Sequence, residues 1–186
     1  MAHAAGIESI QTERLSLERI RPEDVDDMVE MHQDDRFVEV FGHRSTPEHV
    51  RTFTGKQMED WDRLGFSLWT IRDRETGAFI GRGGLRAVTI EGVDEVELGY
   101  GLRPEWWDRG LATELSRTAL GVGFERLGLE SVVSFTLPTN ARSRNVMEKV
   151  GMTFERDIVW ADMPHVLYRI TGETWRVAAY PASLRG

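Results

Sequence analysis

The stretch from residue 103 to residue 114 constrains the fold of this chain most, because an apolar strand must end there and a helix must begin. Pro104 cannot continue the hydrogen bonding of a strand, and Gly110 and Ala112 stand at the start of an apolar helical pattern. The first N–H groups of a helix have no intrahelical partner and carry partial positive charge. With small residues at the turn and Arg109 beside it, the sequence predicts a diphosphate-binding turn. An ordinary turn without a ligand is the alternative.

Hydrophobic periodicity predicts the elements on either side of this turn. Strands are expected at residues 11–20, 66–71, 78–88, 95–102, 131–137, 152–160 and 166–170. Helices are expected at residues 22–32, 46–65, 111–127 and 140–151. Residues 34–45 read as a loop, and the tail from Gly172 has no clear pattern. This order predicts an α/β (α+β) fold with a mixed central sheet and helices on both faces.

Composition narrows the classes of partner. The 186 residues fit one domain, and 31 acidic against 23 basic side chains give a net charge of -8. That charge argues against a surface that binds nucleic acid and favours a cationic small molecule or a basic peptide. The chain has no cysteine and no apolar run of roughly 20 residues. Its first residues do not resemble a signal peptide, so we expect a cytoplasmic protein without a membrane partner.

Three segments carry a family resemblance: Glu97-Leu98-Gly99-Tyr100, residues 106–114, and residues 140–154. In this order and spacing they resemble the GCN5-related N-acetyltransferases (GNAT), in particular the branch with the RimJ and RimL ribosomal-protein acetyltransferases. Residues 12–17 are similar to the first strand of that family. The resemblance implies a domain at residues 10–171, with residues 1–9 and 172–186 as terminal extensions.

The resemblance also implies a GNAT fold with splayed middle strands and acetyl-CoA as cosubstrate, without a metal. The diphosphate would lie on residues 107–113, and the pantetheine arm between the strands at 95–102 and 131–137. The expected cofactor-binding residues are Leu98, Gly99, Tyr100, Leu102, Trp107, Asp108, Arg109, Gly110, Leu111, Ala112, Thr113, Asn140 and Ser143. Relatives usually carry glycine where this chain has Asp108, so we expect this carboxylate to point outward or to pair with Arg109.

Acetyl transfer to an amine needs a base for the amine, a polarised thioester carbonyl and a proton for the leaving thiolate. Glu97 is the first candidate for the base, acting through a water, with Glu95 and Asp94 next. An ordinary exposed strand residue is the alternative for Glu97. Backbone N–H groups around Leu98 and Gly99 are expected to bond the carbonyl oxygen.

The proton donor for the leaving thiolate is expected to differ from the tyrosine that many members of this family use. Many GNAT enzymes place a tyrosine seven residues after the asparagine that starts the helix, and this chain has Met147 there, which cannot donate a proton. Ser143 is therefore the candidate, with support of the first helical turn as its alternative role. His165 is a lesser candidate at the substrate end.

Three further groups of side chains are candidates, with core packing or solvated surface charge as the alternative. An acceptor pocket could be walled by Phe41, Trp69 and Trp160. Cationic contact to the phosphates of CoA could come from Arg103, Arg109, Arg142 and Arg144. The tryptophan pair at 106–107 could line the path of the cofactor.

The function expected from this resemblance is transfer of an acetyl group from acetyl-CoA to a primary amine by direct attack in a ternary complex. The amine could be a protein N-terminus or a small molecule, and a homodimer is compatible with the sequence. A CoA-binding regulatory module without turnover is the main alternative, and an interaction scaffold without a ligand is another. The acceptor and the length of the acyl group are not readable from the residues.

Overall fold

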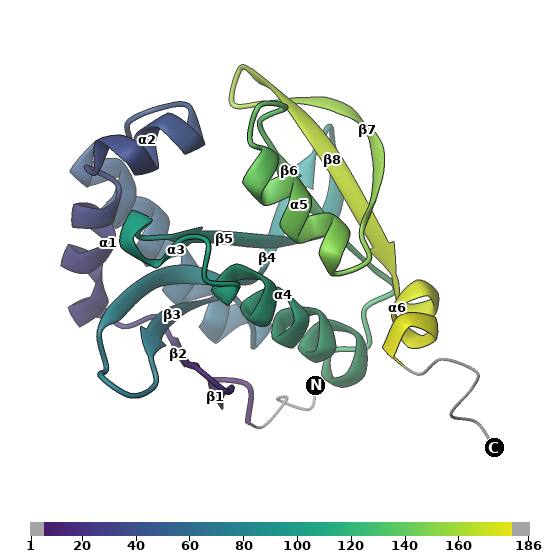
Figure 1. Ribbon diagram of the computed structural model, residues 1–186, viewed down its shortest axis with the longest axis horizontal. Coiled ribbons are helices and arrows are strands. Elements are labelled where there is room, and N and C mark those ends of the chain that lie inside the picture. Colours follow the sequence, from purple (N-terminus) through teal and green to yellow (C-terminus); the bar gives the residue numbers. More distant parts are fainter. Residues whose placement is uncertain (1–5, 180–186) are drawn as a thin grey trace.

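A mixed eight-stranded sheet in the order β1-β2-β3-β4-β5-β6-β8-β7 runs through the molecule (Figure 1). This computed structural model describes residues 6–179. The strands are β1 Ser9–Gln11, β2 Leu15–Arg19, β3 Leu68–Asp73, β4 Phe79–Ile90, β5 Val93–Leu102, β6 Ser131–Thr136, β7 Thr153–Trp160 and β8 Met163–Thr171. The helices are α1 Val25–Met31, α2 Asp35–Phe41, α3 Pro47–Leu64, α4 Leu111–Gly121, α5 Ala141–Lys149 and α6 Gly172–Ala179. Short 3-10 turns stand at Pro22–Asp24 and Pro104–Trp106.

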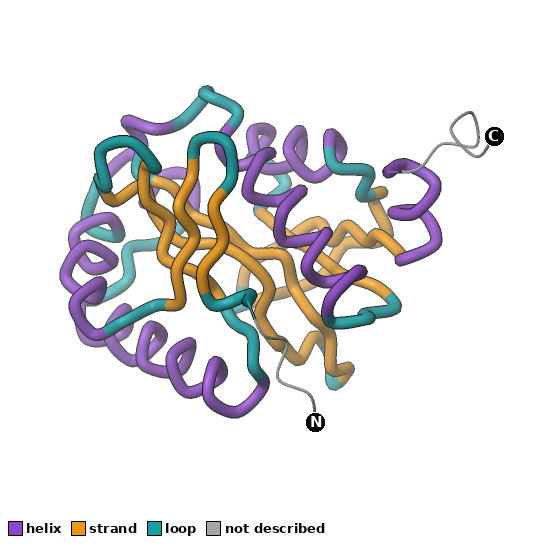
Figure 2. Tube along the Cα trace, turned by 90° about the horizontal axis from the view of Figure 1, so that it is seen from below, coloured by secondary structure: helices purple, strands orange, loops and turns teal. Residues whose placement is uncertain are grey.

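Helices cover both faces of the sheet, as the sequence predicted (Figure 2). A side chain at Gly101 of β5 would meet Phe37 and Phe41 of α2, so α2 lies over that face. A side chain at Gly83 of β4 would meet Leu115 of α4, which lies over the other face. Helices α4 and α5 contribute to the core cluster on the second face, and α1 and α3 contribute to a separate cluster on the first. The mixed GNAT-type architecture expected from the sequence is confirmed.

The sheet opens between its middle strands. Strands β4 and β5 pair over ten positions, from Ile90 with Val93 to Gly81 with Leu102. The parallel strands β5 and β6 share a single pair, Glu97 with Val133. Beyond that pair the strands diverge, and the Oγ of Ser134 donates to the carbonyl of Leu98 at 2.8 Å. The splay expected between the strands is therefore present.

Helix α2 corrects the expectation of a loop at residues 34–45. Asp34 is its N-cap, with a carboxylate that accepts from the Arg36 N–H, and Gly42 ends it in a left-handed conformation at φ 83°. Phe37 is 1% exposed and packs into the cluster of α1 and α3. Both caps were visible in the sequence, but a seven-residue helix offers too few turns for its periodicity to stand out.

Two smaller differences concern element boundaries. The strand expected at residues 11–20 is a hairpin of β1 and β2, whose turn is held by the Oγ1 of Thr12 and the N–H of Leu15 at 3.0 Å. The helix expected at residues 111–127 is α-helical to Gly121 and π-helical over Val122–Arg126.

The boundaries at residues 10 and 171 stay a prediction. Strand β1 begins at Ser9, before the expected start, and α6 packs beyond the expected end through the Trp175 ring on Phe124. The other residues of the expected extensions, 1–5 and 180–186, lie outside the described range. Within residues 6–179, no helix is long and apolar enough to cross a bilayer.

Candidate active site

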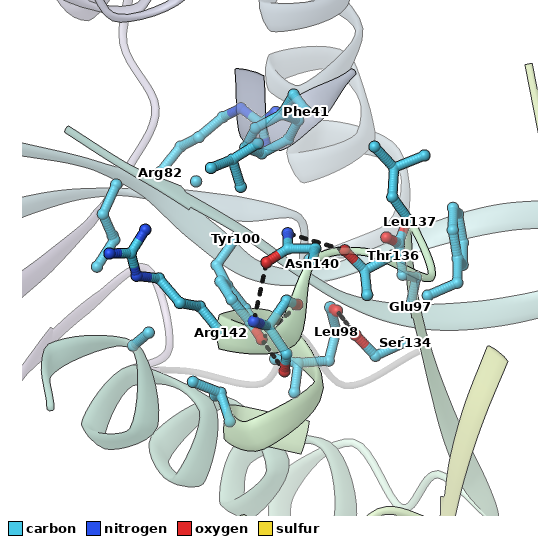
Figure 3. A pocket seen from close by; sticks show the side chains of 18 of the residues that line it. Phe41, Arg82, Glu97, Leu98, Tyr100, Ser134, Thr136, Leu137, Asn140 and Arg142 are labelled. Atoms are coloured by element: carbon cyan, nitrogen blue, oxygen red, sulfur yellow. Dashed lines mark hydrogen bonds between the residues drawn. The ribbon is translucent and has the colours of Figure 1, made fainter. Parts of the chain in front are cut away.

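A cavity of about 760 Å³ lies where β5 and β6 diverge (Figure 3). One end is bounded by α2, the first turns of α3, and strand β4, and the other by the turn before α4 and by α5. Most of the expected cofactor-binding residues line it: Leu98, Gly99, Tyr100, Leu102, Trp107, Asp108, Gly110, Leu111, Ala112, Thr113, Asn140 and Ser143. Segments that lie far apart in the sequence therefore meet at one site.

The turn before α4 is open to the cavity. Gly110 has φ 76° and caps the helix without a side-chain hydrogen bond. Within the described residues, no protein group accepts from the N–H groups of Leu111, Ala112 or Thr113. Arg109 is the exception among the expected residues, because it does not line the cavity; its Cζ lies 4.9 Å from the centroid of the Trp106 ring. Free N–H groups at a helix start are suited to an anion.

Asp108 takes part in an ion pair, although not with the partner expected. It pairs with Arg142 at 3.3 Å, and the Cζ of Arg142 lies 5.1 Å from the centroid of the Trp107 ring. Of the two expectations for Asp108, an outward orientation agrees with its side chain, which is 70% exposed, and a pair with Arg109 is wrong because Arg109 stacks on Trp106 instead. Asp108 has φ 59°, a conformation that aspartate tolerates better than most residues.

The edges of the gap carry unpaired backbone. Because the Leu98 carbonyl faces β6, the amides of Leu98 and Tyr100 also face β6, whereas the Gly99 amide faces β4. Of the N–H groups expected around Leu98 and Gly99 to bond the carbonyl oxygen, that of Gly99 therefore does not face the gap. Across the gap, Asn140 caps α5: its Oδ1 accepts from the Ser143 N–H at 3.1 Å.

Ser143 has a partner that the sequence did not suggest. Its Oγ lies 3.0 Å from the hydroxyl of Tyr100, which reaches it from β5. Burial raises the pKa of Tyr100 to about 12, so this hydroxyl keeps its proton at neutral pH. The pair places two hydroxyl groups side by side at the gap, where one can pass a proton to the other.

Among the three candidate carboxylates, only Glu97 lines the cavity. It is 5% exposed, and its Oε2 accepts from the Nε of Arg86 at 2.5 Å. Its Oε1 lies 3.3 Å from the place where a Cβ at Gly99 would stand, so a side chain at Gly99 would crowd this oxygen. Glu95 is held by Arg169 at 2.7 and 3.0 Å, and Asp94 accepts from Thr89 at 2.8 Å. The alternative of an ordinary exposed strand residue is thus wrong for Glu97.

Among the other aromatic and histidine candidates, some line the cavity and one does not. Phe41, Trp160 and His165 line the cavity, and the His165 ring packs edge-on against Phe135. Trp69 does not, because it is buried in the core and its Nε1 donates to the Ile7 carbonyl.

Of the four candidate arginines, only Arg142 lines the cavity. Arg103 pairs with Glu30 at 2.7 Å, and Arg144 donates to the Tyr168 hydroxyl at 3.1 Å. In the described part of the chain, no group of three or more His, Cys, Asp or Glu residues could hold a metal ion.

Several lining residues were not found from the sequence. Arg82 and Arg86 lie on β4 directly opposite Gly101 and Glu97 of β5, so all four share one face of the sheet. The register of the β4–β5 hairpin would have been the signal, because pairing the two strands aligns both arginines with the segment that carries the family resemblance.

The sequence of this chain is similar to those of known acetyltransferases. A family model described as an acetyltransferase (GNAT) domain matches residues 14–153. The uncharacterized protein YkkB of Bacillus subtilis is 33% identical over 104 residues, which cover 56% of this chain and 60% of YkkB. The FsC-acetyl coenzyme A-N(2)-transacetylase of Aspergillus fumigatus is 34% identical over 100 residues, which cover 50% of this chain and 43% of that enzyme. The match thus spans less than two thirds of each of these two relatives.

The fold of this chain is also similar to that of a solved acetyltransferase structure. The acetyltransferase from Agrobacterium tumefaciens superposes with a TM-score of 0.78 at 26% identity, covering 89% of this chain and 95% of that one. With a matching fold, a splayed pair of middle strands and a family model that spans most of its length, this chain belongs to the GNAT acetyltransferase family.

Proposed function

We propose that this chain is an N-acetyltransferase that moves an acetyl group from acetyl-CoA to a primary amine by direct attack in a ternary complex. The observation that carries the proposal is a single cavity with an open helix start at one end and the Glu97 carboxylate at the other. The Aspergillus relative is named as a transacetylase that uses acetyl-CoA, which supports the same donor. We further propose a RimJ/RimL-like branch, from the three sequence segments, and a cytoplasmic location.

The residues present fit acetyl-CoA. Buried backbone groups need hydrogen-bond partners, and the Tyr100 amide lacks one from β6 because the strands share no pair beyond Glu97. The amide groups of pantetheine would supply such partners. Leu111, Ala112 and Thr113 would bind the diphosphate through their N–H groups, and Asn140 would line the path between. The cosubstrate supplies the activated acetyl group.

Different side chains carry out the two proton transfers of the reaction. The amine nitrogen attacks the thioester carbon, a C–N bond forms and the C–S bond breaks. Glu97 accepts the proton that the amine loses, through a water, while Arg86 positions its carboxylate. Ser143 donates a proton to the leaving thiolate, and Tyr100 can replace it from its own hydroxyl. Proximity in the ternary complex supplies roughly 7–11 kcal/mol when the geometry is good.

Replacing Ser143 with alanine tests the donor role. The Oγ of Ser143 faces Tyr100, and the helix start is capped separately by Asn140. We therefore expect the chemical step to slow by about 10²-fold, near the lower limit for general acids because a water can substitute. CoA affinity and melting temperature should change little. Single-turnover kinetics and a melting curve measure both; a normal chemical step with a lower melting temperature would assign Ser143 to support of the helix.

Replacing Asp108 with asparagine tests the diphosphate turn. The carboxylate lies at the mouth of the cavity, 3.3 Å from Arg142, and lowers the positive charge available to a phosphate. Asparagine tolerates the same backbone conformation, so the fold should be kept. We expect CoA to bind about 2- to 5-fold more tightly, as for an exposed charge worth up to 1 kcal/mol. Calorimetric titration at low salt is the measurement, and weaker binding would contradict this geometry of the turn.

A panel of amines tests the function itself. Acetyl-CoA is incubated with the protein and with each amine, and release of the CoA thiol is followed. Amine-dependent thiol release supports acetyl transfer. Binding of CoA without thiol release for any amine would favour the regulatory module, and no binding of CoA would favour the scaffold.

A further inference from the structure

Among the described residues, the end of the cavity under α2 and α3 holds a cation that forms no ion pair. Arg82 of β4 lines it, and its Cζ lies 4.9 Å from the centroid of the Phe53 ring and 6.0 Å from that of Phe41. Figure 3 shows the Arg82 side chain beside Phe41. Its Nε is buried, and among residues 6–179 the guanidinium makes no hydrogen bond and no ion pair.

No acid among the described residues forms an ion pair with Arg82. In the described range, the acids that line the cavity are Glu97 and Asp108, which pair with Arg86 and Arg142. Burial lowers the pKa of His32 to about 4, so its ring is neutral at pH 7. Burial and the nearby charge of Arg86 lower the pKa of Arg82 to about 10, against the opposing charge of Glu97, and Arg82 is still protonated at pH 7.

The surroundings of Arg82 define what it can bind. A buried donor without a partner lowers stability, and a ligand that accepts from it recovers that free energy. Two aromatic rings pack against the guanidinium. A planar guanidinium can bind a carboxylate through two parallel hydrogen bonds. On the same face of the sheet, Gly101 stands opposite Arg82 under the rings of Phe37 and Phe41, and Gly99, two residues along β5, adds no side chain on the way to Glu97.

We propose that the acceptor is a primary amine that also carries a carboxylate, which Arg82 binds while the amine lies between Gly99 and Glu97. This inference rests on the proposed acetyl transfer and names the substrate class of the same site. It reverses the preference expected from the net charge of -8, since the charge of the acceptor site that has no ion-pair partner among the described residues, that of Arg82, is positive. Polyamines and aminoglycosides, which are cationic throughout, would be poor acceptors.

A series of matched acceptors tests the inference. Glycine, β-alanine, γ-aminobutyrate and longer ω-amino acids are each compared with their primary amide, which keeps the chain and the amine and removes the charge. At the preferred chain length, kcat/KM for the acid should exceed that for the amide by about 10- to 100-fold, as for a hydrogen-bonded charge. Amides that match or exceed their acids throughout the series would overturn the inference.

Variants connect the preference to Arg82. Arg82→Met keeps most of the contact with the rings and removes the charge, so the ratio of acid to amide should fall to about 1. Arg82→Lys keeps the charge without the bidentate geometry, so the ratio should be intermediate. Arg51→Met is the matched control, because Arg51 is exposed on α3, pairs only with Asp26 among the described residues and does not line the cavity. A ratio that survives in Arg82→Met, with CoA binding intact, would overturn the inference.

A binding measurement distinguishes failure of this inference from failure of the proposed function. The melting temperature of the CoA-loaded protein is measured with the acid and with its amide. If acid and amide are acetylated equally, the result supports acetyl transfer and contradicts carboxylate binding by Arg82. If no amine is acetylated but the acid stabilises the protein and fails to stabilise Arg82→Met, the carboxylate site stands and acetyl transfer fails.

Discussion

Replacing Glu97 with glutamine is expected to lower kcat/KM by about 10²- to 10⁴-fold and to change CoA affinity by only a few-fold. Glutamine keeps the shape and one oxygen acceptor of the side chain, but it cannot take a proton from the amine. Of the three candidate carboxylates, the change removes the one that lines the cavity in the described part of the chain. Steady-state kinetics over a pH series, with calorimetric titration of CoA, measures the two effects separately.

Glu95→Gln is the matched control for this experiment. Glu95 lies two residues earlier on β5 and also forms a half-buried ion pair, with Arg169, but it does not line the cavity. Both variants remove an ion pair and should lower the melting temperature, although Arg169 keeps its second partner, Glu155. Only Glu97→Gln should lose turnover. Equal losses in the two variants would assign the effect to stability and would contradict Glu97 as the base.

Replacing Gly110 with glutamate is expected to weaken CoA binding by about 100-fold or more, as if several charge-assisted hydrogen bonds were lost. Gly110 has φ 76°, so any side chain strains the turn that presents the N–H groups of α4. The carboxylate would also repel the diphosphate at the position where the helix start would bind it. Calorimetric titration of CoA is the measurement.

Two controls separate strain and charge at this turn. Gly110→Ala adds strain without charge and should weaken CoA binding less than Gly110→Glu. Gly128→Glu adds the same charge at another left-handed glycine, φ 67°, with no atom within 4 Å of the added Cβ and no part in the cavity. It should keep CoA affinity. Full affinity in Gly110→Glu would remove the turn before α4 from the proposed cofactor site.

Local features of the chain could be predicted because their causes are local. The strand that ends at Pro104 and the helix that begins after Gly110 follow from the chemistry of those two residues, and the structure has both. The splay between β5 and β6 was expected from the family resemblance, and the single pair of Glu97 with Val133 confirms it. The cavity therefore lies at the place to which the sequence pointed.

Features that depend on pairing and packing could not be read in the same way. The Tyr100–Ser143 contact joins β5 to α5 across 43 residues and depends on where α5 packs on the sheet. Arg82 faces the cavity because the register of β4 on β5 sets it opposite Gly101, and a slip of one residue would point it to the other face. Helix α2, which contributes Phe41 to the same end of the cavity, was too short for its period to be seen.

The central claim, direct transfer of an acetyl group from acetyl-CoA to an amine, is tested most directly by a single-turnover experiment. Protein in excess over acetyl-CoA is mixed with the amine, and mass spectrometry follows the free CoA, the acetylated amine and the intact protein. We predict equal amounts of CoA and acetylated amine, no acetylated protein when the amine is left out, and a much slower reaction in Glu97→Gln. Acetyl-CoA that binds and stays intact with every amine, or an acetyl group that moves first to the protein, would contradict the account.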